Sequence, residues 1–153
     1  MNFQKGPIEG VVITPFRKFV DERGWLAEIF RNDETDYRAV MSYVSMTNPG
    51  VARGPHEHVE QSDLFCFFGR FRLYLWDNRK GSATYGKKIV HDGGEVPFIA
   101  VVPPGVVHAY RNIGDSGALV LNLPDRLYRG EGRSGQVDEI RYEDDPDSPF
   151  RID

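Results

Sequence analysis

Short apolar runs alternate with clusters of Gly, Pro, Asn and Asp along most of the chain. The runs are rich in β-branched and aromatic residues, a composition typical of strands bounded by turns. Nine strands are expected, at residues 8–13, 25–30, 41–46, 64–68, 71–76, 87–90, 98–102, 107–112 and 118–123. Helical spacing is scarce, and only residues 33–40 suit a turn or a short helix. Nine short strands with close turns predict an all-β fold of the sandwich or jelly-roll type.

Two further features complete this outline of the fold. The runs 64–68 and 71–76 are separated only by Gly69-Arg70, which predicts a hairpin with a two-residue turn. From Tyr128 onward the chain is polar and Gly-rich, then acidic, which predicts a tail that packs on the surface or is partly mobile. No repeat or internal boundary is visible. We therefore expect one domain over residues 1–153, with its core at about 8–128 and a polar tail at 129–153.

Length and charge narrow the class of protein. A chain of 153 residues can bury a core of its own. The net charge of −4 argues against a nucleic-acid partner. The sequence shows neither an apolar run long enough to span a membrane nor the apolar region of a signal peptide. These observations predict a cytoplasmic protein without a membrane partner. The single cysteine, Cys66, lies in an apolar run and is expected in the core.

Three of the four histidines fall into a two-part pattern. His56 and His58 are two residues apart, so a strand would place both imidazoles on one face and Glu57 on the other. His108 follows a Pro-Gly turn inside an apolar run. Histidine is the side chain best suited to proton transfer near neutral pH and also binds transition metals. The pattern therefore predicts a site inside a barrel, with the two histidine strands as neighbours.

The same spacing resembles the two motifs of the cupin superfamily. The first motif is a glycine followed, after five residues, by His-x-His, and it matches residues 50–58. The second motif is Pro-x-Gly followed, after two residues, by a histidine and, after three more, by an asparagine; it matches residues 103–112. Asp63 stands where the first motif has a glutamate. This resemblance implies a cupin-type double-stranded β-helix, or jelly-roll barrel. Many cupins bind Zn, Fe, Mn or Ni through three histidines and one carboxylate. Here that set would be His56, His58, His108 and either Asp63 or Glu60; the alternative is a cavity lined by histidines without a metal.

A second resemblance covers the chain from about residue 8 to 153. Several blocks resemble the dTDP-4-dehydrorhamnose 3,5-epimerase family, a branch of the cupins that generally needs no cofactor. The blocks are Asp-Glu-Arg-Gly at 21–24, Glu-Ile-Phe at 28–30, Gly-Val-Ala-Arg-Gly-Pro-His at 50–56, Asp-Asn-Arg-Lys-Gly-Ser-Ala-Thr-Tyr-Gly at 77–86, Val-Pro-Pro-Gly-Val-Val-His-Ala-Tyr at 102–110 and Glu-Ile-Arg-Tyr-Glu-Asp-Asp-Pro at 139–146. Their order and spacing are kept, so the resemblance is stronger than any single block.

The family's reaction removes a proton next to a ketone and returns one from the other face. It needs a base, a group that stabilises the enolate, and an acid. The resemblance implies that His56 is the base. It also implies a substrate-binding set of Arg23, Glu28, Arg53, His108 and Asn112. Arginine suits this role because its guanidinium pairs with two phosphate oxygens.

The chain departs from the family at three catalytic positions. Asp63 stands at the position of the family's lysine, and Leu121 at that of its acid tyrosine. The sequence ends at Asp153, before the segment matching the family's C-terminal aspartate. Tyr110 is a candidate replacement for the acid, or else an aromatic residue lining the cavity. Loss of the lysine together with the gain of His58 suggests that a divalent ion polarises the ketone.

Three functions follow, in order of preference. The first is epimerisation or isomerisation of a dTDP-linked 4-keto-6-deoxyhexose, which would serve surface polysaccharide or secondary-metabolite glycosylation. The second is a metal-dependent cupin, an isomerase or dioxygenase, using His56, His58, Asp63 and His108. The third is a cupin that binds a sugar nucleotide without catalysis. The resemblance also implies a homodimer that exchanges N-terminal strands.

Overall fold

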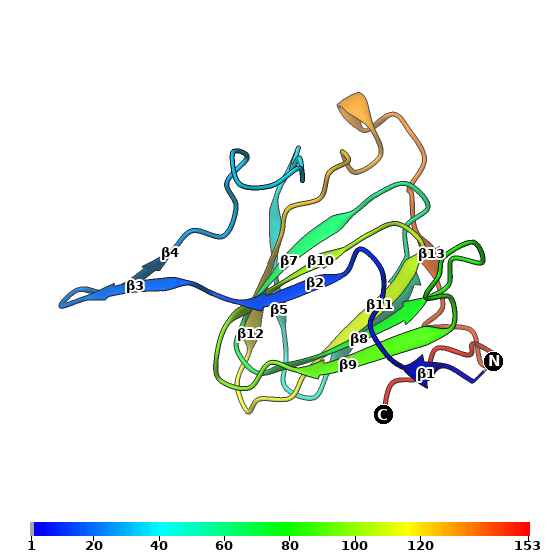
Figure 1. The fold of residues 1–153 in the computed structure, drawn as a ribbon, viewed down its shortest axis with the longest axis horizontal. Helices are drawn as coiled ribbons and strands as arrows, with labels where there is room; N and C mark the ends of the chain where they lie inside the picture. The colour runs from blue at the N-terminus through cyan, green and yellow to red at the C-terminus, as the bar shows by residue number, and fades with distance from the viewer. Residues whose placement is uncertain (1) are drawn as a thin grey trace.

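The computed structural model describes residues 2–153, and nearly all of their regular structure is β-strand (Figure 1). One sheet has six strands, in the order β1 (Gln4–Lys5), β9 (Lys87–Asp92), β8 (Phe71–Asp77), β11 (Val106–Asn112), β6 (Ala52–Glu57) and β13 (Ile140–Arg141). A second has five, in the order β2 (Val12–Pro15), β10 (Phe98–Val102), β7 (Asp63–Phe68), β12 (Ala118–Asn122) and β5 (Tyr43–Thr47). β3 (Lys18–Asp21) and β4 (Gly24–Ala27) form a separate hairpin. A single turn of 3₁₀ helix, Glu131–Arg133, completes the regular structure of the described residues.

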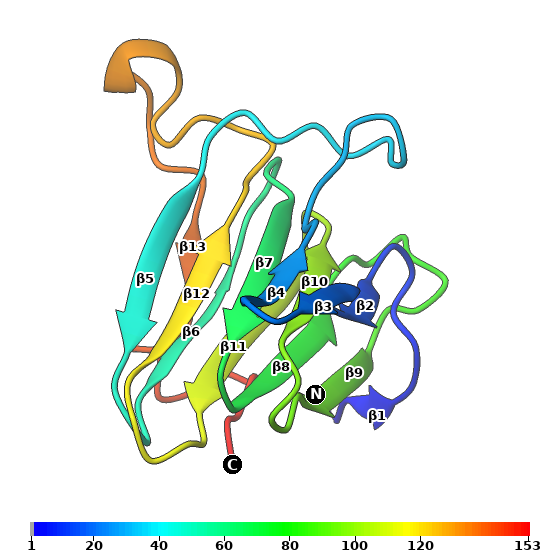
Figure 2. The same ribbon diagram turned by 90° about the vertical axis from the view of Figure 1, so that its left-hand side faces the viewer.

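The two large sheets lie face to face and enclose the core between them (Figure 2). Rings from both sheets meet in this space. Phe67 of β7 lies 5.2 Å from Phe71 of β8 and 5.3 Å from Tyr110 of β11, between ring centres. These side chains are almost fully buried. The predicted all-β jelly roll is therefore confirmed, and so is the burial of Cys66.

The hairpin predicted at Gly69-Arg70 is wrong. β7 pairs with β10 and β12, whereas β8 pairs with β9 and β11, so the two strands belong to opposite sheets. Both strands are almost fully buried, so the backbone polar groups along both of their edges need partners, which neighbouring strands in the same sheet supply. Gly69 turns the chain between the sheets with φ +128°, and a Cβ there would lie 2.7 Å from the Cβ of Ala118.

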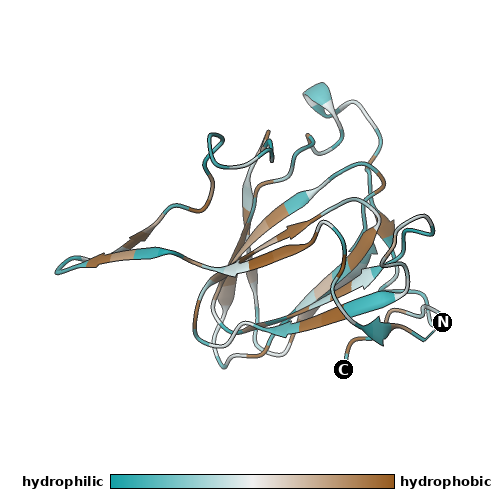
Figure 3. Ribbon diagram, viewed as in Figure 1, coloured by the Kyte–Doolittle hydropathy of each residue, from teal (hydrophilic) through white to brown (hydrophobic). Residues whose placement is uncertain are grey.

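Most of the other expected strands are present, with shifted ends. The first expected strand begins instead at Val12, although Ile8 is buried in the core. Residues 33–40 form turns and no helix. The strands β1, β3 and β13 were not expected, and β6 was expected only from the spacing of its histidines. β3 and β4 project from the barrel as a two-stranded ribbon that contains several hydrophobic residues (Figures 1 and 3).

Parts of the C-terminal segment join the barrel, although most of residues 129–147 are exposed. β13 pairs with β6 and extends the six-stranded sheet. Phe150 is buried against Trp76 and Tyr142, with ring centres 5.7 and 4.7 Å away. The core therefore includes residues such as Phe150 that lie beyond the expected boundary near residue 128. None of the helical structure in residues 2–153 is long and apolar enough to cross a bilayer.

Candidate functional site

The histidine cluster sits where β6 and β11 pair. The register places His108 directly opposite His56, with ring centres 4.4 Å apart. His58 lies 5.9 Å from His56 and 5.6 Å from His108. Glu57 points to the other face, where it accepts a hydrogen bond of 2.6 Å from the hydroxyl of Tyr142. The predicted neighbouring strands and the shared face of His56 and His58 are thus confirmed.

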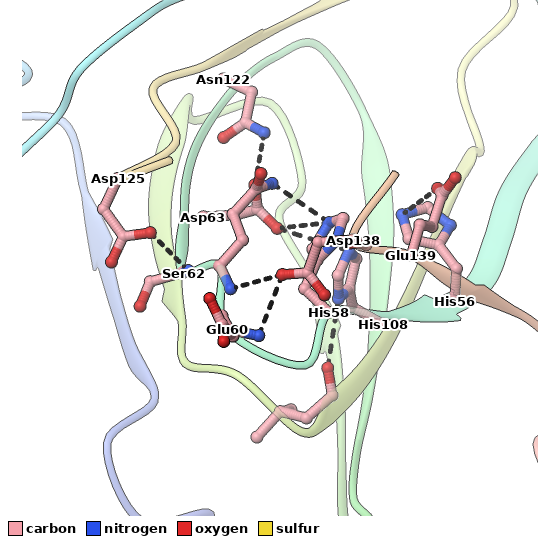
Figure 4. A network of polar contacts seen from close by, with 12 residues as sticks. His56, His58, Glu60, Ser62, Asp63, His108, Asn122, Asp125, Asp138 and Glu139 are labelled. Carbon is pink, nitrogen blue, oxygen red and sulfur yellow. Dashed lines mark hydrogen bonds and ion pairs between the residues drawn. The ribbon is translucent and has the colours of Figure 1, made fainter. Parts of the chain in front are cut away.

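Asp63 reaches the histidines from the opposite sheet (Figure 4). Its side chain is 1% exposed, and one carboxylate oxygen lies 3.2 Å from Nε2 of His58 and 3.7 Å from Nε2 of His108. The other oxygen accepts hydrogen bonds from the side-chain amides of Gln61 (2.9 Å) and Asn122 (2.7 Å). A buried carboxylate is tolerated because it is both paired and hydrogen-bonded.

The segment before β13 supplies two more carboxylates. Asp138 accepts hydrogen bonds from the backbone N–H groups of residues 59, 60 and 61, and its carbonyl oxygen accepts one from Nδ1 of His58. A carboxylate oxygen of Glu139 lies 3.8 Å from Nε2 of His56 (Figure 4). Neither residue was assigned a role in the site from the sequence, although Glu139 begins the last of the family-like blocks. The acidic pair directly before Ile140-Arg141 was the available signal.

The three imidazoles carry different charges because their surroundings differ. Burial, with the neighbouring His108 and His58, lowers the pKa of His56 to about 2, so this ring is neutral. Burial also acts to lower the pKa of His58, but Asp63 and Asp138 outweigh it and raise the pKa to about 9. Burial lowers the pKa of His108 as well. The site therefore holds one imidazolium and two neutral imidazoles at neutral pH.

Two cavities open beside the cluster. The larger, of about 880 Å³, runs under the segment 124–141 and is of a size typical for small-molecule sites. The smaller, of about 350 Å³, is lined by Arg53 and Tyr110 among others. Four residues line both cavities: Tyr43, His56, Glu139 and Arg141. Both cavities therefore give access to the neutral imidazole of His56.

The same cluster has the chemistry of a divalent metal site. One nitrogen from each of His56, His58 and His108 lies within 4.8 Å of the others. Nε2 of His108 is buried without a hydrogen-bond partner, and it faces the Asp63 oxygen that pairs with His58. Nδ1 of His108 lies 3.2 Å from a backbone carbonyl, which leaves Nε2 with its lone pair free. Of the two carboxylates proposed from the sequence, Asp63 faces the histidines, whereas Glu60 is exposed.

The fold agrees with comparisons to known proteins. The profile of the dTDP-4-dehydrorhamnose 3,5-epimerase family matches residues 5–145. The chain belongs to this family. It is therefore a nucleotide-sugar epimerase, an isomerase, as the sequence predicted.

Three relatives place the chain within the epimerase family. It is 38% identical to a probable low-salt glycan biosynthesis epimerase, Agl13, of Haloferax volcanii, over 79% of this chain and 81% of that one. It is 33% identical to the spore coat polysaccharide biosynthesis protein SpsL of Bacillus subtilis, over 88% of each chain. The crystal structure of a dTDP sugar isomerase from Desulfovibrio desulfuricans superposes with a TM-score of 0.78 at 25% identity, covering 94% of this chain and 91% of that one.

The epimerase assignment makes the departures at the catalytic positions informative. Leu121, at the expected position of the acid tyrosine, packs in an apolar cluster with Leu64 and Cys66. Because side chains alternate along a strand, its neighbour Asn122 points toward Asp63 instead. Glu139 provides a carboxylate beside His56, although it comes from another part of the chain than the family's C-terminal aspartate.

Four of the five expected substrate-binding residues do not line the cavities of this chain: Arg23, Glu28, His108 and Asn112. His108 is buried within the histidine cluster. Arg23 lies at the tip of the β3–β4 hairpin, 83% exposed, and pairs with Asp21. Glu28 follows the same hairpin and pairs with Arg31. Asn112 is fully buried and donates hydrogen bonds to the backbone carbonyls of residues 47 and 116, so it fixes a turn. The interpretation of Asn112 as a substrate-binding residue is wrong, because its amide is already engaged within the fold.

Proposed function

We propose that this epimerase acts on a 4-keto-6-deoxyhexose linked to dTDP, with His56 as the base that removes a proton next to the ketone. The observation that carries the proposal is the His56 imidazole on the wall of a cavity of suitable size, with the carboxylate of Glu139 3.8 Å away. A neutral imidazole can accept a proton directly. Glu139 then stabilises the imidazolium that forms, as the acidic member of a catalytic dyad does.

The enolate formed in this step needs a positive charge nearby. The family's lysine is absent, and Asp63 occupies its position. His58 supplies the charge instead, because Asp63 and the backbone of Asp138 hold it protonated beside the two neutral rings. Arg53 and Arg141 line the cavities and offer guanidinium groups to the diphosphate.

Isotope exchange tests the base. dTDP-4-keto-6-deoxyglucose is incubated with the protein in D2O and followed by proton NMR. We expect deuterium to enter at C3 or C5 with the wild-type protein and not with His56→Asn, which keeps the side chain's size but removes the base. Absence of exchange with the wild-type protein would remove this function for this substrate.

A homodimer would complete the substrate site. The β3–β4 hairpin exposes Phe19, Val20, Trp25 and Leu26, a group of apolar side chains that a partner chain would cover. In an exchanged dimer, Arg23 at its tip and Glu28 would approach the partner's cavity, which explains their distance from the cavities of their own chain. The cytoplasmic location stays a prediction from the sequence.

A metal-dependent reaction is the second candidate. The observation that favours it is Nε2 of His108, which is buried without a hydrogen-bond partner and faces the Asp63 carboxylate at 3.7 Å. His56, His58, His108 and Asp63 would hold the ion, and a divalent cation bound there would polarise a ketone oxygen. Elemental analysis and the same exchange assay after chelation distinguish the two. If the protein contains one metal ion per chain and chelation abolishes deuterium exchange, the metal-dependent reaction is supported. If metal-free protein still catalyses the exchange, His58 is the positive charge that stabilises the enolate.

A further inference from the structure

Tyr43 occupies a position in the site that neither the sequence motifs nor the family assignment indicated. It lies on β5, and the strand register places it directly opposite Asn122 of β12. Its hydroxyl oxygen is 2.9 Å from the side-chain nitrogen of Asn122. Asn122 is fully buried, so the hydroxyl reaches into the barrel although the residue as a whole is 45% exposed.

The direction of these hydrogen bonds leaves the Tyr43 proton available. The ionised carboxylate of Asp63 can only accept, so the Asn122 atom 2.7 Å from it must be the amide nitrogen. That nitrogen has two hydrogens, one for Asp63 and one for Tyr43. The Tyr43 oxygen therefore accepts this bond, and its own O–H is not used by Asn122.

Tyr43 and His56 come from opposite sheets of the barrel. β5 is the edge strand of the five-stranded sheet, and β6 lies in the six-stranded sheet that faces it (Figure 2). Both side chains line both cavities. A sugar ring held between the sheets would therefore have the imidazole on one face and the phenol on the other. Inversion at a carbon needs this arrangement of base and acid.

We propose that Tyr43 is the catalytic acid of this epimerase, in place of the tyrosine that the family carries on another strand. The inference rests on the proposed function. His56 takes the proton as the C–H bond breaks, and its electron pair passes to the ketone oxygen to form the enolate. Tyr43 then gives its proton to the same carbon from the opposite face, and the enolate electrons return to form the new C–H bond. Solvent restores the proton of Tyr43 and removes that of His56.

Two further observations agree with this role. Burial raises the pKa of Tyr43 to about 12, so the phenol is protonated at neutral pH and can act as an acid. Tyr110, the candidate acid from the sequence, lines only the smaller cavity. Its ring is packed among Phe65, Phe67 and Phe71, at distances of 5.9, 5.3 and 5.7 Å between ring centres.

The test measures two events in the same D2O reaction: deuterium entry at the sugar carbon and formation of the inverted sugar. For Tyr43→Phe we expect exchange to continue within about threefold of the wild-type rate, while inversion falls by about 100-fold or more. The base still removes the proton, but without the acid the carbon is reprotonated from the original face. Tyr85→Phe, on an exposed loop away from both cavities, is the matched control.

The outcomes separate this inference from the proposed function. Inversion by Tyr43→Phe at the wild-type rate would overturn the role of Tyr43, and so would loss of inversion in Tyr110→Phe alone. A wild-type protein that shows neither exchange nor inversion would overturn the proposed function itself.

Asn122 provides a second, independent variant. It acts through Tyr43 and is a positioning residue. Asn122→Ala keeps the phenol of Tyr43 but removes the hydrogen bond that positions it. We therefore expect the ratio of exchange to inversion to rise while KM stays near the wild-type value. An unchanged ratio would contradict the proposal even if Tyr43→Phe failed to fold.

Discussion

His56, His58 and His108 are chemically identical side chains in one cluster, yet their neighbours give them different charges. His58 has Asp63 on one nitrogen and a backbone carbonyl on the other, so it holds a proton. His56 is buried and faces two other imidazoles, so it stays neutral. A motif identifies the residue type, whereas the atoms around each ring decide which one accepts a proton.

At the residue scale, Glu139 is expected to govern the rate of proton removal. Glu139→Gln keeps the shape but replaces the charge that stabilises the His56 imidazolium. We expect kcat to fall by about 10- to 100-fold with little change in KM. Steady-state kinetics measure both, with Glu95→Gln, on the exposed surface, as the control. An unaltered kcat would show that Glu139 does not act on the base.

Asp77 is expected to govern stability at acidic pH. It is fully buried and accepts hydrogen bonds from Arg79, Ser82 and Thr84. Burial alone raises its pKa, but these bonds outweigh burial and hold the pKa well below the usual value of 3.8. Because the folded pKa is depressed, the stabilisation is present above about pH 4 and is lost as the pH falls through the folded pKa.

The variant Asp77→Asn measures this contribution. We expect a loss of about 3 kcal/mol in the free energy of unfolding at pH 7, because Arg79 loses its charged partner and the new amide cannot accept all three bonds. The difference from the wild-type protein should shrink below pH 4. Urea denaturation at several pH values provides the comparison, and Asp115→Asn, at an exposed position, should change little. A difference that grows on acidification would contradict the assignment.

At the scale of elements, the C-terminal segment holds the site and the barrel together. β13 pairs with β6, the strand that carries His56, and places Glu139 beside that ring. Farther along, Phe150 is buried between Trp76 and Tyr142. The segment is polar overall because only a few of its side chains face inward, so composition alone understates its role.

Removal of the Phe150 ring should therefore destabilise the whole fold. Phe150→Ala is expected to lower the free energy of unfolding by about 3 kcal/mol, because it leaves a cavity beneath Trp76. Val96→Ala, at a residue that is 53% exposed, serves as the control. The measurement is chemical denaturation followed by tryptophan fluorescence. If Phe150→Ala proved as stable as Val96→Ala, the C-terminal segment would be a surface attachment after all.

At the scale of the whole molecule, the projecting hairpin is the part of the chain that the barrel does not use. Its apolar side chains face solvent, and Lys18 lies over the ring of Trp25 at 4.5 Å. A two-stranded ribbon of this kind is marginally stable by itself. We expect it to be stabilised by a second copy of the chain.

The dimer prediction is tested by sedimentation velocity. We expect a dimer for the wild-type protein and a monomer for Trp25→Asp, because a charge placed in the apolar contact cannot be desolvated without a partner. Val96→Asp, on another exposed surface, should remain dimeric. KM should rise in the monomer, since Arg23 could no longer reach a partner's cavity. A wild-type monomer would refute the dimer, and a dimeric Trp25→Asp would place the contact elsewhere.

Residue patterns in the sequence were enough to predict the all-β class, most strand positions, the clustering of three histidines and the epimerase family. Apolar alternation and motif spacing are local properties that follow from the period of a strand and the chemistry of imidazole. Only the tertiary structure decided that β7 and β8 lie in opposite sheets, that Glu139 stands beside His56, and that Asn122 rather than Leu121 faces Asp63. It also brought Tyr43 against Asn122, 79 residues away. The spacing of apolar residues indicates that a strand is buried. It does not indicate which distant strand pairs with it or packs against it, because those contacts depend on the packing of the whole barrel.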